Sequence, residues 1–391
     1  MRCEIPSPGV SRSPGACHNR QSGTLSPVTP ITRRHLPLLF TGALAARAQQ
    51  PATELDWHNA KEFTVEGLGF NDLKSPYDRL PARAEGVVRQ AVWDLSRDAA
   101  GVLVRFVANT PSIHARWTVT KRTLTIPTMT AVASSGLDLY ARDDARRWRW
   151  LSIGRPTQFP DNTGALASSL PPGPREYMLY LPLRNGLASL EIGVPKGSTI
   201  RKGPARPAGA KPIVFYGTSI THGAAASRAG MTHVAQLGRM LNHEVINLGF
   251  AGNGKMEPEV TKFVAEINAA AFVLDCLPNM TAAEVRQRAA ACVKTLRAAH
   301  PTTPILLVED RNYADSFLNA ARLERNETNH AALQEVYVQL QRERIGGLAY
   351  LRADHLLGDD GEATIDGSHP TDLGFQRHAA EFARALRPLL P

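Results

Sequence analysis

The chain has few cysteines, and half of them stand near its amino-terminus. Only four of the 391 residues are cysteine. Cys3 and Cys17 fall within the first 48 residues, which leaves Cys276 and Cys292 for the rest of the chain. Two thiols cannot build the disulfide framework of a small secreted scaffold. Cys276 follows an apolar run and Cys292 stands inside a helical pattern, so we expect both to be buried free thiols.

Long apolar runs and a strong charge of one sign are also missing. The run from Leu36 to Ala46 spans 11 residues, whereas a helix needs about 20 to cross a bilayer. No later segment is longer and equally apolar, so we expect no membrane span in the mature chain. Of the formal net charge of +9, residues 1–48 carry +5. The remaining +4 is too small a basic excess to indicate a nucleic-acid partner.

Residues 1–48 have the pattern of an export signal. Arg33 and Arg34 precede the short apolar run, and an A-x-A cleavage pattern ends at Ala48. The arginine pair also resembles a twin-arginine signal. We therefore expect a periplasmic or extracellular protein. The alternative is a basic tail followed by a buried helix.

Residues 54–202 predict short strands separated by turns. Apolar and polar residues alternate, or nearly so, in segments 102–106, 113–117, 137–140 and 187–192. Gly and Pro clusters separate these segments, and no convincing helical stripe is present. This spacing is typical of an all-β, jelly-roll-like sandwich. Residues 203–211, rich in Pro, Gly and Ala, predict a linker to the next domain.

Residues 212–391 predict alternating strands and helices. Apolar runs recur at 213–216, 245–248, 271–274, 305–308 and 348–351. Between them, Pro258 suits the first turn of one helix, and Thr281 with Glu284 forms the capping box of another. The alternation predicts an α/β domain with a doubly wound parallel sheet, flavodoxin-like in its three layers. In such sheets the functional site lies at the carboxyl ends of the strands.

Polar residues and glycines follow these expected strand ends. Ser219 stands in a Gly-flanked turn after the first strand, Gly252 after the second, and Asn279 after the third. Asp366 and His369 precede the last helix. Each feature alone is common, since small residues and Asn populate many turns and an Asp-x-x-His pair often only caps a loop. Their common location at one sheet edge is what makes them candidates for a site.

Together these four blocks resemble the SGNH (GDSL-like) hydrolase family, over the whole of residues 212–391. The matching residues are Gly-Thr-Ser-Ile-Thr-His-Gly around Ser219, Gly252, Leu-Pro-Asn279 and Asp366-Gly-Ser-His369. Upstream, Gly136-Leu-Asp-Leu-Tyr140 resembles the Gly-x-Asp-Leu-Tyr signature of the β-domain that precedes one bacterial branch. The first block departs from the usual Gly-Asp-Ser-Leu, but the replaced Asp is not a triad member.

The resemblance implies a serine esterase. Ser219 would be the nucleophile and His369 its base, while Asp366 would fix the imidazole tautomer. Backbone N–H groups of Ser219 and Gly252, with the Asn279 side chain, would form the oxyanion hole. No cofactor and no metal are implied. The implied substrates are short-chain acyl esters, in particular O-acetyl groups on small molecules or polysaccharides. A lipase or thioesterase on the same triad and a non-catalytic carbohydrate-binding protein stay open as alternatives, and the sequence does not predict an oligomeric state.

A phosphate-binding loop is the rival motif. Residues 249–255 fit G-x-x-x-x-G-K after an apolar strand. The next residue is Met256, where such a loop needs Ser or Thr to hold Mg²⁺. The β-rich first half and the export signal also argue against a nucleotide substrate. Lys255 is then expected to be a solvated charge or to lie at the rim of the site.

Three further residues are candidates for substrate contact. His222 and Arg228 follow the nucleophile turn, and Glu309 follows the fourth strand. Solvated loop side chains explain His222 and Arg228 equally well. For Glu309, with Asp310 and Arg311, a helix cap and a surface ion pair are favoured over substrate contact. Aromatic residues of the first half are expected in its core rather than on a sugar platform: Tyr140, Trp148 and Trp150.

Overall fold

The computed structural model describes residues 54–390, which belong to one compact unit. The predicted export signal and the pattern in residues 1–48 lie outside the described residues. Within the described part of the chain, no helix is both long enough and apolar enough to cross a membrane.

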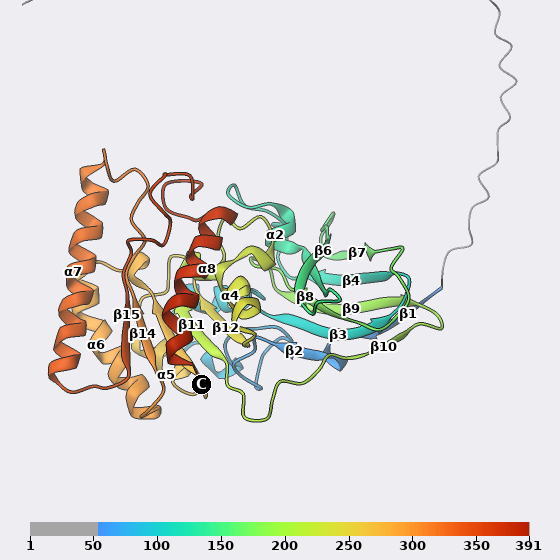
Figure 1. The fold of residues 1–391 in the computed structure, drawn as a ribbon, viewed down its shortest axis with the longest axis horizontal. Coiled ribbons are helices and arrows are strands. Elements are labelled where there is room, and N and C mark those ends of the chain that lie inside the picture. Colours follow the sequence, from blue (N-terminus) through green and yellow to red (C-terminus); the bar gives the residue numbers. More distant parts are fainter. Residues whose placement is uncertain (1–53, 391) are drawn as a thin grey trace, which may run out of the picture. The chain divides into compact units, whose positions relative to one another are not determined.

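The first half of the described chain is built from ten strands. They are β1 Leu55–Asn59, β2 Thr64–Glu66, β3 Leu103–Asn109, β4 Ile113–Val119, β5 Leu137–Arg142, β6 Trp148–Gly154, β7 Asp161–Ala167, β8 Arg175–Tyr180, β9 Leu187–Pro195 and β10 Thr199–Lys202. One antiparallel sheet has the order β1-β9-β4-β7, and the other has β10-β3-β8-β5-β6 with β2 paired to β3 (Figure 1). Phe106 and Leu179 of one sheet pack with Trp117 of the other in a common core. The predicted β-sandwich is confirmed.

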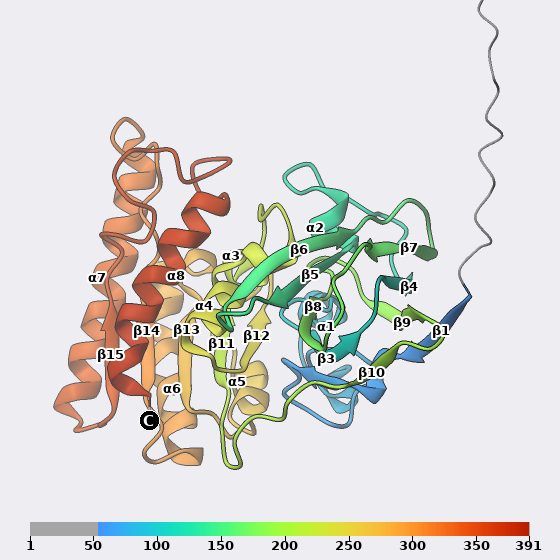
Figure 2. The same cartoon turned by 45° about the vertical axis from the view of Figure 1, so that its right-hand side comes forward.

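The second half contains a parallel sheet covered by helices on both faces. Its strands are β11 Ile213–Gly217, β12 Val245–Gly249, β13 Ala271–Asp275, β14 Ile305–Val308 and β15 Leu348–Leu351, and its helices are α3 Ser219–His222, α4 His233–Leu241, α5 Pro258–Val264, α6 Ala282–Ala299, α7 Ala320–Arg342 and α8 Asp372–Leu386. The strand order is β12-β11-β13-β14-β15. Alternate side chains of each strand pack with α4 and α8 on one face and with α5, α6 and α7 on the other (Figure 2). The predicted doubly wound sheet is confirmed.

Local signals in the sequence match the helix ends. Thr281 and Glu284 form both hydrogen bonds of a capping box at the start of α6, and Pro258 is the first residue of α5. The capping box gives hydrogen-bond acceptors to N–H groups that have no partner within the helix, whereas proline has no N–H group that would need one. Cys276 and Cys292 are buried free thiols, as predicted.

A segment of the first half leaves the sandwich and packs on the second. Between β2 and β3 the chain forms the short helices η2 Ala82–Ala84 and α1 Gln90–Ser96. Phe70, Val92 and Trp93 of this segment belong to the same apolar core as Ile246 and Phe263. We call residues 67–102 the docking segment. The sequence predicted only strands and turns here, because a helix of seven residues is too short to establish a helical period.

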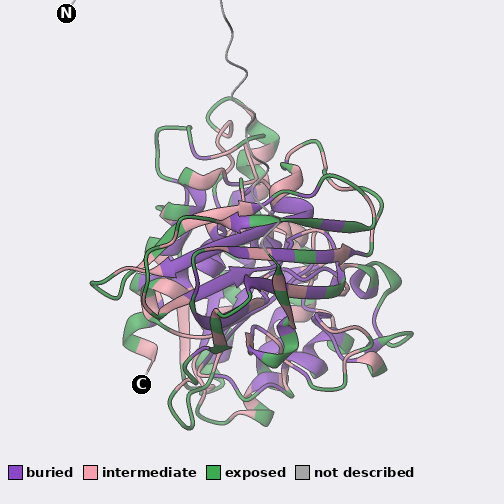
Figure 3. Ribbon diagram, turned by 90° about the vertical axis from the view of Figure 1, so that its right-hand side faces the viewer, coloured by how far each residue is buried: buried purple, intermediate pink, exposed green. Residues whose placement is uncertain are grey.

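Burial follows these contacts. Buried residues concentrate in the strands, and exposed residues in the loops and outer helix faces (Figure 3). The β5–β8 face of the sandwich does not meet solvent, since Tyr140, Met178 and Tyr180 pack with Ile220 of α3 and Ala235 of α4. The sandwich therefore forms one wall beside the turn that carries Ser219.

Candidate active site

Ser219 is the first residue of α3, directly after the end of β11. Thr218 caps the helix, with its hydroxyl accepting from the Ile220 N–H at 3.3 Å. A Cβ at position 217 would lie 2.0 Å from the Thr221 hydroxyl oxygen, so only glycine permits this sharp turn. The Ser219 side chain is half-buried. Its backbone N–H is the first of a helix and has no acceptor within that helix.

The structure brings Ser219, His369 and Asp366 into one chain of hydrogen bonds. Ser219 Oγ lies 2.8 Å from His369 Nε2, and His369 Nδ1 lies 2.8 Å from Asp366 Oδ2. Asp366 Oδ1 also accepts from the backbone N–H of His369 at 2.8 Å and of Ser368 at 3.0 Å. Partial burial opposes ionisation, but these hydrogen bonds hold the pKa of Asp366 below its ordinary value. A carboxylate so placed keeps Nδ1 protonated and leaves Nε2 free to accept the serine proton.

The loops after β12 and β13 bring Gly252 and Asn279 to the same edge of the sheet. Gly252 has a φ of +72° and is exposed, and its N–H donates to no other described residue. Asn279 ends the short helix η4 Leu277–Asn279, and its Oδ1 accepts from the Gly254 N–H at 3.3 Å. The occupied carbonyl oxygen leaves the Nδ2 group of Asn279 as a donor. Gly254 is held close, because a Cβ there would lie 1.9 Å from the Gly217 carbonyl oxygen.

Arg311 supports the loop that carries His369. Its Nε donates to the Ser368 carbonyl oxygen at 3.1 Å, and its Nη2 donates to the Ser368 hydroxyl. Arg311 also pairs with Asp310, and its guanidinium lies 4.1 Å from the Tyr313 ring centroid. The expected surface ion pair is therefore wrong, since Arg311 is 2% exposed and Asp310 is fully buried. The contact between Arg311 and Ser368 could not be predicted from a local sequence pattern, because 57 residues separate the two.

Glu309 is not placed to meet a substrate. Its Oε1 accepts from the Tyr350 hydroxyl and its Oε2 from the Ala353 N–H, both at 2.8 Å. The side chain is buried and joins β14 to the end of β15. The expectation of substrate contact, and that of an exposed helix cap, are both corrected by this burial.

His222 is also fully buried, although it lies only three residues after Ser219. Its ring faces Arg79 and Arg184, each at 3.5 Å, and Asp98 at 3.5 Å. Burial and the neighbouring arginines hold the pKa of His222 well below its ordinary value, so the ring is neutral. Neither substrate contact nor a solvated loop position, the two sequence-based expectations, fits a side chain without exposed surface.

Arg79 of the docking segment is a residue that sequence reasoning missed. Its Nη1 donates to the carbonyl oxygens of Asn247 at 3.0 Å and Gly249 at 2.7 Å, and its Nε to that of Asp98 at 2.8 Å. Burial lowers the pKa of Arg79 to about 10, which still leaves it charged near neutrality. The guanidinium thus fixes the carboxyl end of β12, from which the Gly252 turn begins.

The remaining candidates divide between core and surface. Arg228 is partly exposed and pairs with buried Asp138 at 2.9 Å. Tyr140 is buried and Trp148 partly buried, as expected of core residues. Trp150 is 51% exposed, so its assignment to the core is wrong. β6 is the last strand of its sheet, and no neighbouring strand covers it.

Residues 249–255, which fit the pattern of a phosphate-binding loop, have a different structure. Met256, at the position where such a loop needs a hydroxyl, is 1% exposed and packs in the apolar core. Lys255 Nζ lies 3.5 Å from Glu284 of the α6 capping box. Lys255 is therefore a partly exposed charge with a carboxylate partner.

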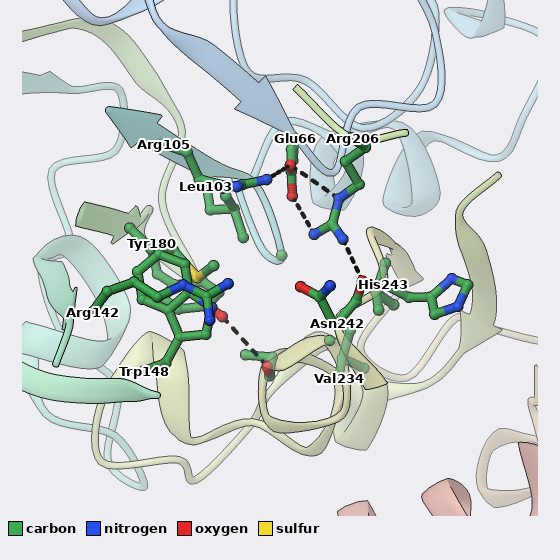
Figure 4. A pocket seen from close by; sticks show the side chains of 15 residues that line it. Glu66, Leu103, Arg105, Arg142, Trp148, Tyr180, Arg206, Val234, Asn242 and His243 are labelled. Carbon is green, nitrogen blue, oxygen red and sulfur yellow. Dashed lines mark hydrogen bonds and ion pairs between the residues drawn. The ribbon is translucent and has the colours of Figure 1, made fainter. Parts of the chain in front are cut away.

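A cavity between the sandwich and α4 has a different lining (Figure 4). Trp148 and Val234 are among the residues around it. Glu66 pairs there with Arg105 and, at 2.8 Å, with Arg206. None of the predicted site residues lines this cavity, and its charged groups already satisfy one another. We therefore place the candidate site at Ser219 instead.

Comparisons with known proteins agree with this arrangement. The profile of the GDSL-like lipase/acylhydrolase family matches residues 210–387, and that of the GxDLY N-terminus of SGNH-hydrolase-type esterases matches residues 55–200. The chain is similar to a GDSL-like lipase of known structure from Bacteroides ovatus, with 35% identity and a TM-score of 0.81 over 86% of this chain and 98% of that one. No curated protein gives a significant match.

Two more distant structures share the fold. One is a salicylyl-acyltransferase from a tetracycline biosynthetic pathway, with 17% identity and a TM-score of 0.68 over 87% of this chain and 98% of that one. The other is a family two carbohydrate esterase from Cellvibrio japonicus, with 15% identity and a TM-score of 0.56 over 86% of this chain and 98% of that one. At these identities the likeness concerns the arrangement of both halves and not the substrate.

Proposed function

This chain belongs to the GDSL-like lipase/acylhydrolase family and is a carboxylic ester hydrolase, and from that premise we propose that it removes short acyl groups, chiefly acetyl, from carbohydrate esters. The observation that carries the proposal is the chain of two 2.8 Å hydrogen bonds from Ser219 through His369 to Asp366. A serine hydroxyl becomes a competent nucleophile when a neighbouring base accepts its proton.

In the proposed reaction Ser219 Oγ attacks the ester carbonyl carbon while His369 Nε2 takes the hydroxyl proton. Asp366 stabilises the resulting imidazolium through Nδ1. The carbon–oxygen bond to the alcohol then breaks, and the proton on Nε2 passes to the leaving oxygen. Water, deprotonated by the same nitrogen, attacks the acyl-enzyme and releases the acid, which restores Ser219 with its proton.

Negative charge develops on the carbonyl oxygen in both steps. The N–H groups of Ser219 and Gly252 and the Nδ2 group of Asn279 are the donors that would receive it. Support comes from the Asn279 side chain, whose Oδ1 is already engaged by the Gly254 N–H. With its oxygen held there, the amide presents its donor side without reorganising.

The setting of the triad supports a small acyl group on a larger alcohol. The His369 and Asp366 side chains are 30% and 40% exposed, so a bulky leaving group can approach them from solvent. The chain that follows α3 turns back on it at Gly223 and Ala224, whose N–H groups both donate to the Ser219 carbonyl oxygen. Both residues are buried, so this side leaves no space for a long acyl chain.

Replacement of Ser219 tests the proposal. Ser219→Ala is expected to lower kcat for p-nitrophenyl acetate about a thousandfold or more, with an unchanged melting temperature. A fluorophosphonate probe should label the wild type and not this variant. Ser189→Ala, a change at an exposed serine on β9, is the matched control and should keep both activity and labelling. Retention of more than a tenth of wild-type kcat by Ser219→Ala would exclude Ser219 as the nucleophile.

A lipase or thioesterase activity on the same triad is the second candidate. Phe317 and Leu318, in the loop between β14 and α7, are 80% and 83% exposed. This loop contacts the triad loop, with the Ala314 N–H donating to the Gly367 carbonyl oxygen at 3.0 Å. Rates with p-nitrophenyl acetate, butyrate and octanoate decide between the two. A rise in kcat/KM with chain length would favour the lipid substrate over the acetyl ester.

A further inference from the structure

Trp150 is an exposed tryptophan held in a fixed orientation. It pairs with Tyr140 across β5 and β6, and so its side chain lies on the sheet face that packs against the second half of the molecule. Tyr140 is covered there, whereas Trp150, on the last strand, is 51% exposed. Its exposed ring is apolar surface that a ligand can cover, and covering it would be favourable.

Two contacts fix the ring. The indole Nε1 donates to Asp138 Oδ1 at 3.1 Å, and the Arg228 guanidinium carbon lies 5.4 Å from the ring centroid. Asp138 is itself 1% exposed and also accepts from the Gly230 N–H at 2.7 Å. The ring is therefore ordered before any ligand arrives, which removes the entropic cost of ordering it on binding.

Arg228 adds polar groups beside the ring. Its Nη1 donates to Asp138 and, at 2.6 Å, to the Tyr140 hydroxyl. Within residues 54–390, its Nε and Nη2 groups donate to no other residue, and a fifth of the side chain is exposed. An apolar ring face next to free N–H donors matches the two kinds of surface that a pyranose offers, its axial C–H face and its hydroxyl groups.

The chain that carries Arg228 connects the nucleophile turn to the start of α8. The chain leaves Ser219 through Gly223 and reaches Ser227, whose N–H donates to Asp372 Oδ1 at 2.9 Å. Asp372 begins α8, shortly after His369. Arg228 follows Ser227 directly, so Arg228, and Trp150 beside it, lie next to the chain that joins the nucleophile turn to the start of α8.

We infer that Trp150 and Arg228 form the subsite for the alcohol part of the substrate, a sugar ring that stacks on the indole and whose hydroxyls accept from the guanidinium. This inference rests on the proposed function, with the acyl group at Ser219 and the sugar toward β6. It assigns to the sandwich a direct part in substrate selection.

The test compares an acetylated sugar with an ester that has no ring. For acetylated xylobiose and ethyl acetate, kcat/KM is measured with wild type, Trp150→Ala and Trp150→Phe. The ratio of the two kcat/KM values is expected to fall about tenfold in Trp150→Ala, mainly through KM for the sugar ester, and less in Trp150→Phe. A p-nitrophenyl ester is unsuitable here, because its own ring would stack on Trp150.

The chain offers a matched control. Trp57 on β1 is also a partly exposed tryptophan with an arginine, Arg116, 4.5 Å from its ring centroid, but it belongs to the other sheet. Trp57→Ala should leave the ratio unchanged. An unchanged ratio in Trp150→Ala, or an equal fall for both esters, overturns the inference. Failure of the proposed function is a separate result, since then the wild type would not hydrolyse acetylated xylobiose, or ethyl acetate hydrolysis would persist in Ser219→Ala.

Discussion

Arg311 links the end of β14 to the loop that carries His369, the proposed base. Both of its contacts to Ser368 lie between Asp366 and His369 in the chain, so the guanidinium holds the segment that orients the proposed base. A guanidinium can donate from Nε and Nη2 to two acceptors at once, whereas an ammonium cannot reproduce that fork. Arg311 is in this sense a positioning residue.

Arg311→Lys is expected to lower kcat about tenfold or more while KM changes little, because a displacement of about 1 Å of a reacting group costs up to a hundredfold in rate. Steady-state kinetics with p-nitrophenyl acetate measure the split. Ser368→Ala, which removes only the hydroxyl contact, should have a smaller effect of the same kind. Arg352→Lys, at an exposed ion pair with Asp354, serves as the control. A fall in melting temperature with normal kcat would show that Arg311 acts on stability alone.

For single residues, the sequence predicted those site residues that stand in a short local motif. Ser219, Gly252, Asn279, Asp366 and His369 each stand in a short motif after a strand, and the structure brings them to one edge of the sheet. The supporting contacts of Arg79 and Arg311 were not predicted because their partners are remote, 168 and 57 residues away for Asn247 and Ser368. A lone arginine in a loop has no pattern that distinguishes a buried support from a surface charge.

Among the helices, α4 and α8 meet around a histidine that has no hydrogen-bond partner. His233 of α4 is fully buried, and neither ring nitrogen has a partner among the described residues. Its ring stacks on Phe375 at 5.7 Å and Phe382 at 5.2 Å, with His378 at 5.6 Å. Burial, and secondarily His378, hold the pKa of His233 well below its ordinary value.

His233→Phe is expected to stabilise the protein by about 1–3 kcal/mol near pH 8, because a buried unsatisfied polar group is replaced by an apolar ring. The gain should grow as pH falls below about 6.5, where the unfolded histidine binds a proton and the folded one does not. Because the pKa of His233 is lower in the folded than in the unfolded state, the free energy of unfolding falls as the pH drops below the unfolded pKa. This fall reaches about 1.4 kcal/mol per pH unit in the wild type and is absent in the variant, which lacks the histidine.

Urea unfolding of both proteins at several pH values measures this difference. Taking the difference is necessary, because burial raises the pKa of Asp275 to about 7 and gives an opposite pH dependence common to both proteins. His355→Phe, at an exposed position, is the control and should change little. A gain that is constant from pH 8 to 5 would contradict the assignment of a neutral, buried His233.

Elements with a clear period were predicted correctly. The five apolar runs after residue 211 became parallel strands, since a strand buried on both faces is continuously apolar. Helix α1 was missed, as were the short η2 turn and α2 Ala131–Ser135. Two or fewer turns do not give a measurable period, and the packing of Trp93 against the second half decides the conformation of α1.

On the scale of the whole molecule, the docking segment joins the two halves through a shared core. Five large apolar residues of this segment pack in the core of the parallel sheet: Phe70, Leu80, Val88, Val92 and Trp93. At about 1.5–3 kcal/mol for each buried side chain, their contribution is on the order of 10 kcal/mol. That is comparable to the entire stability of a typical domain, about 5–15 kcal/mol.

A chain of residues 204–391 is therefore expected not to fold cooperatively, although it contains every residue of the proposed triad. It should bind the dye ANS, show no sharp thermal transition and lack esterase activity. A chain of residues 54–391 should unfold in a single transition by calorimetry and by circular dichroism. A cooperative transition in the shorter chain would show that the parallel sheet is stable without the docking segment.

The docking segment also bears on how such proteins change over generations. Phe70 meets Phe263 edge-on at 6.5 Å, so one apolar core is encoded on both sides of the Pro- and Gly-rich linker. The sequence predicts a domain boundary at that linker. Recombination there would pair a docking segment with a parallel sheet from another protein, against which it would not pack. We therefore expect the two halves to be inherited as a set, and a change of size at position 263 to require a compensating change at position 70. The linker therefore does not separate two exchangeable domains, because residues on its two sides share one packed interface and we expect them to change together.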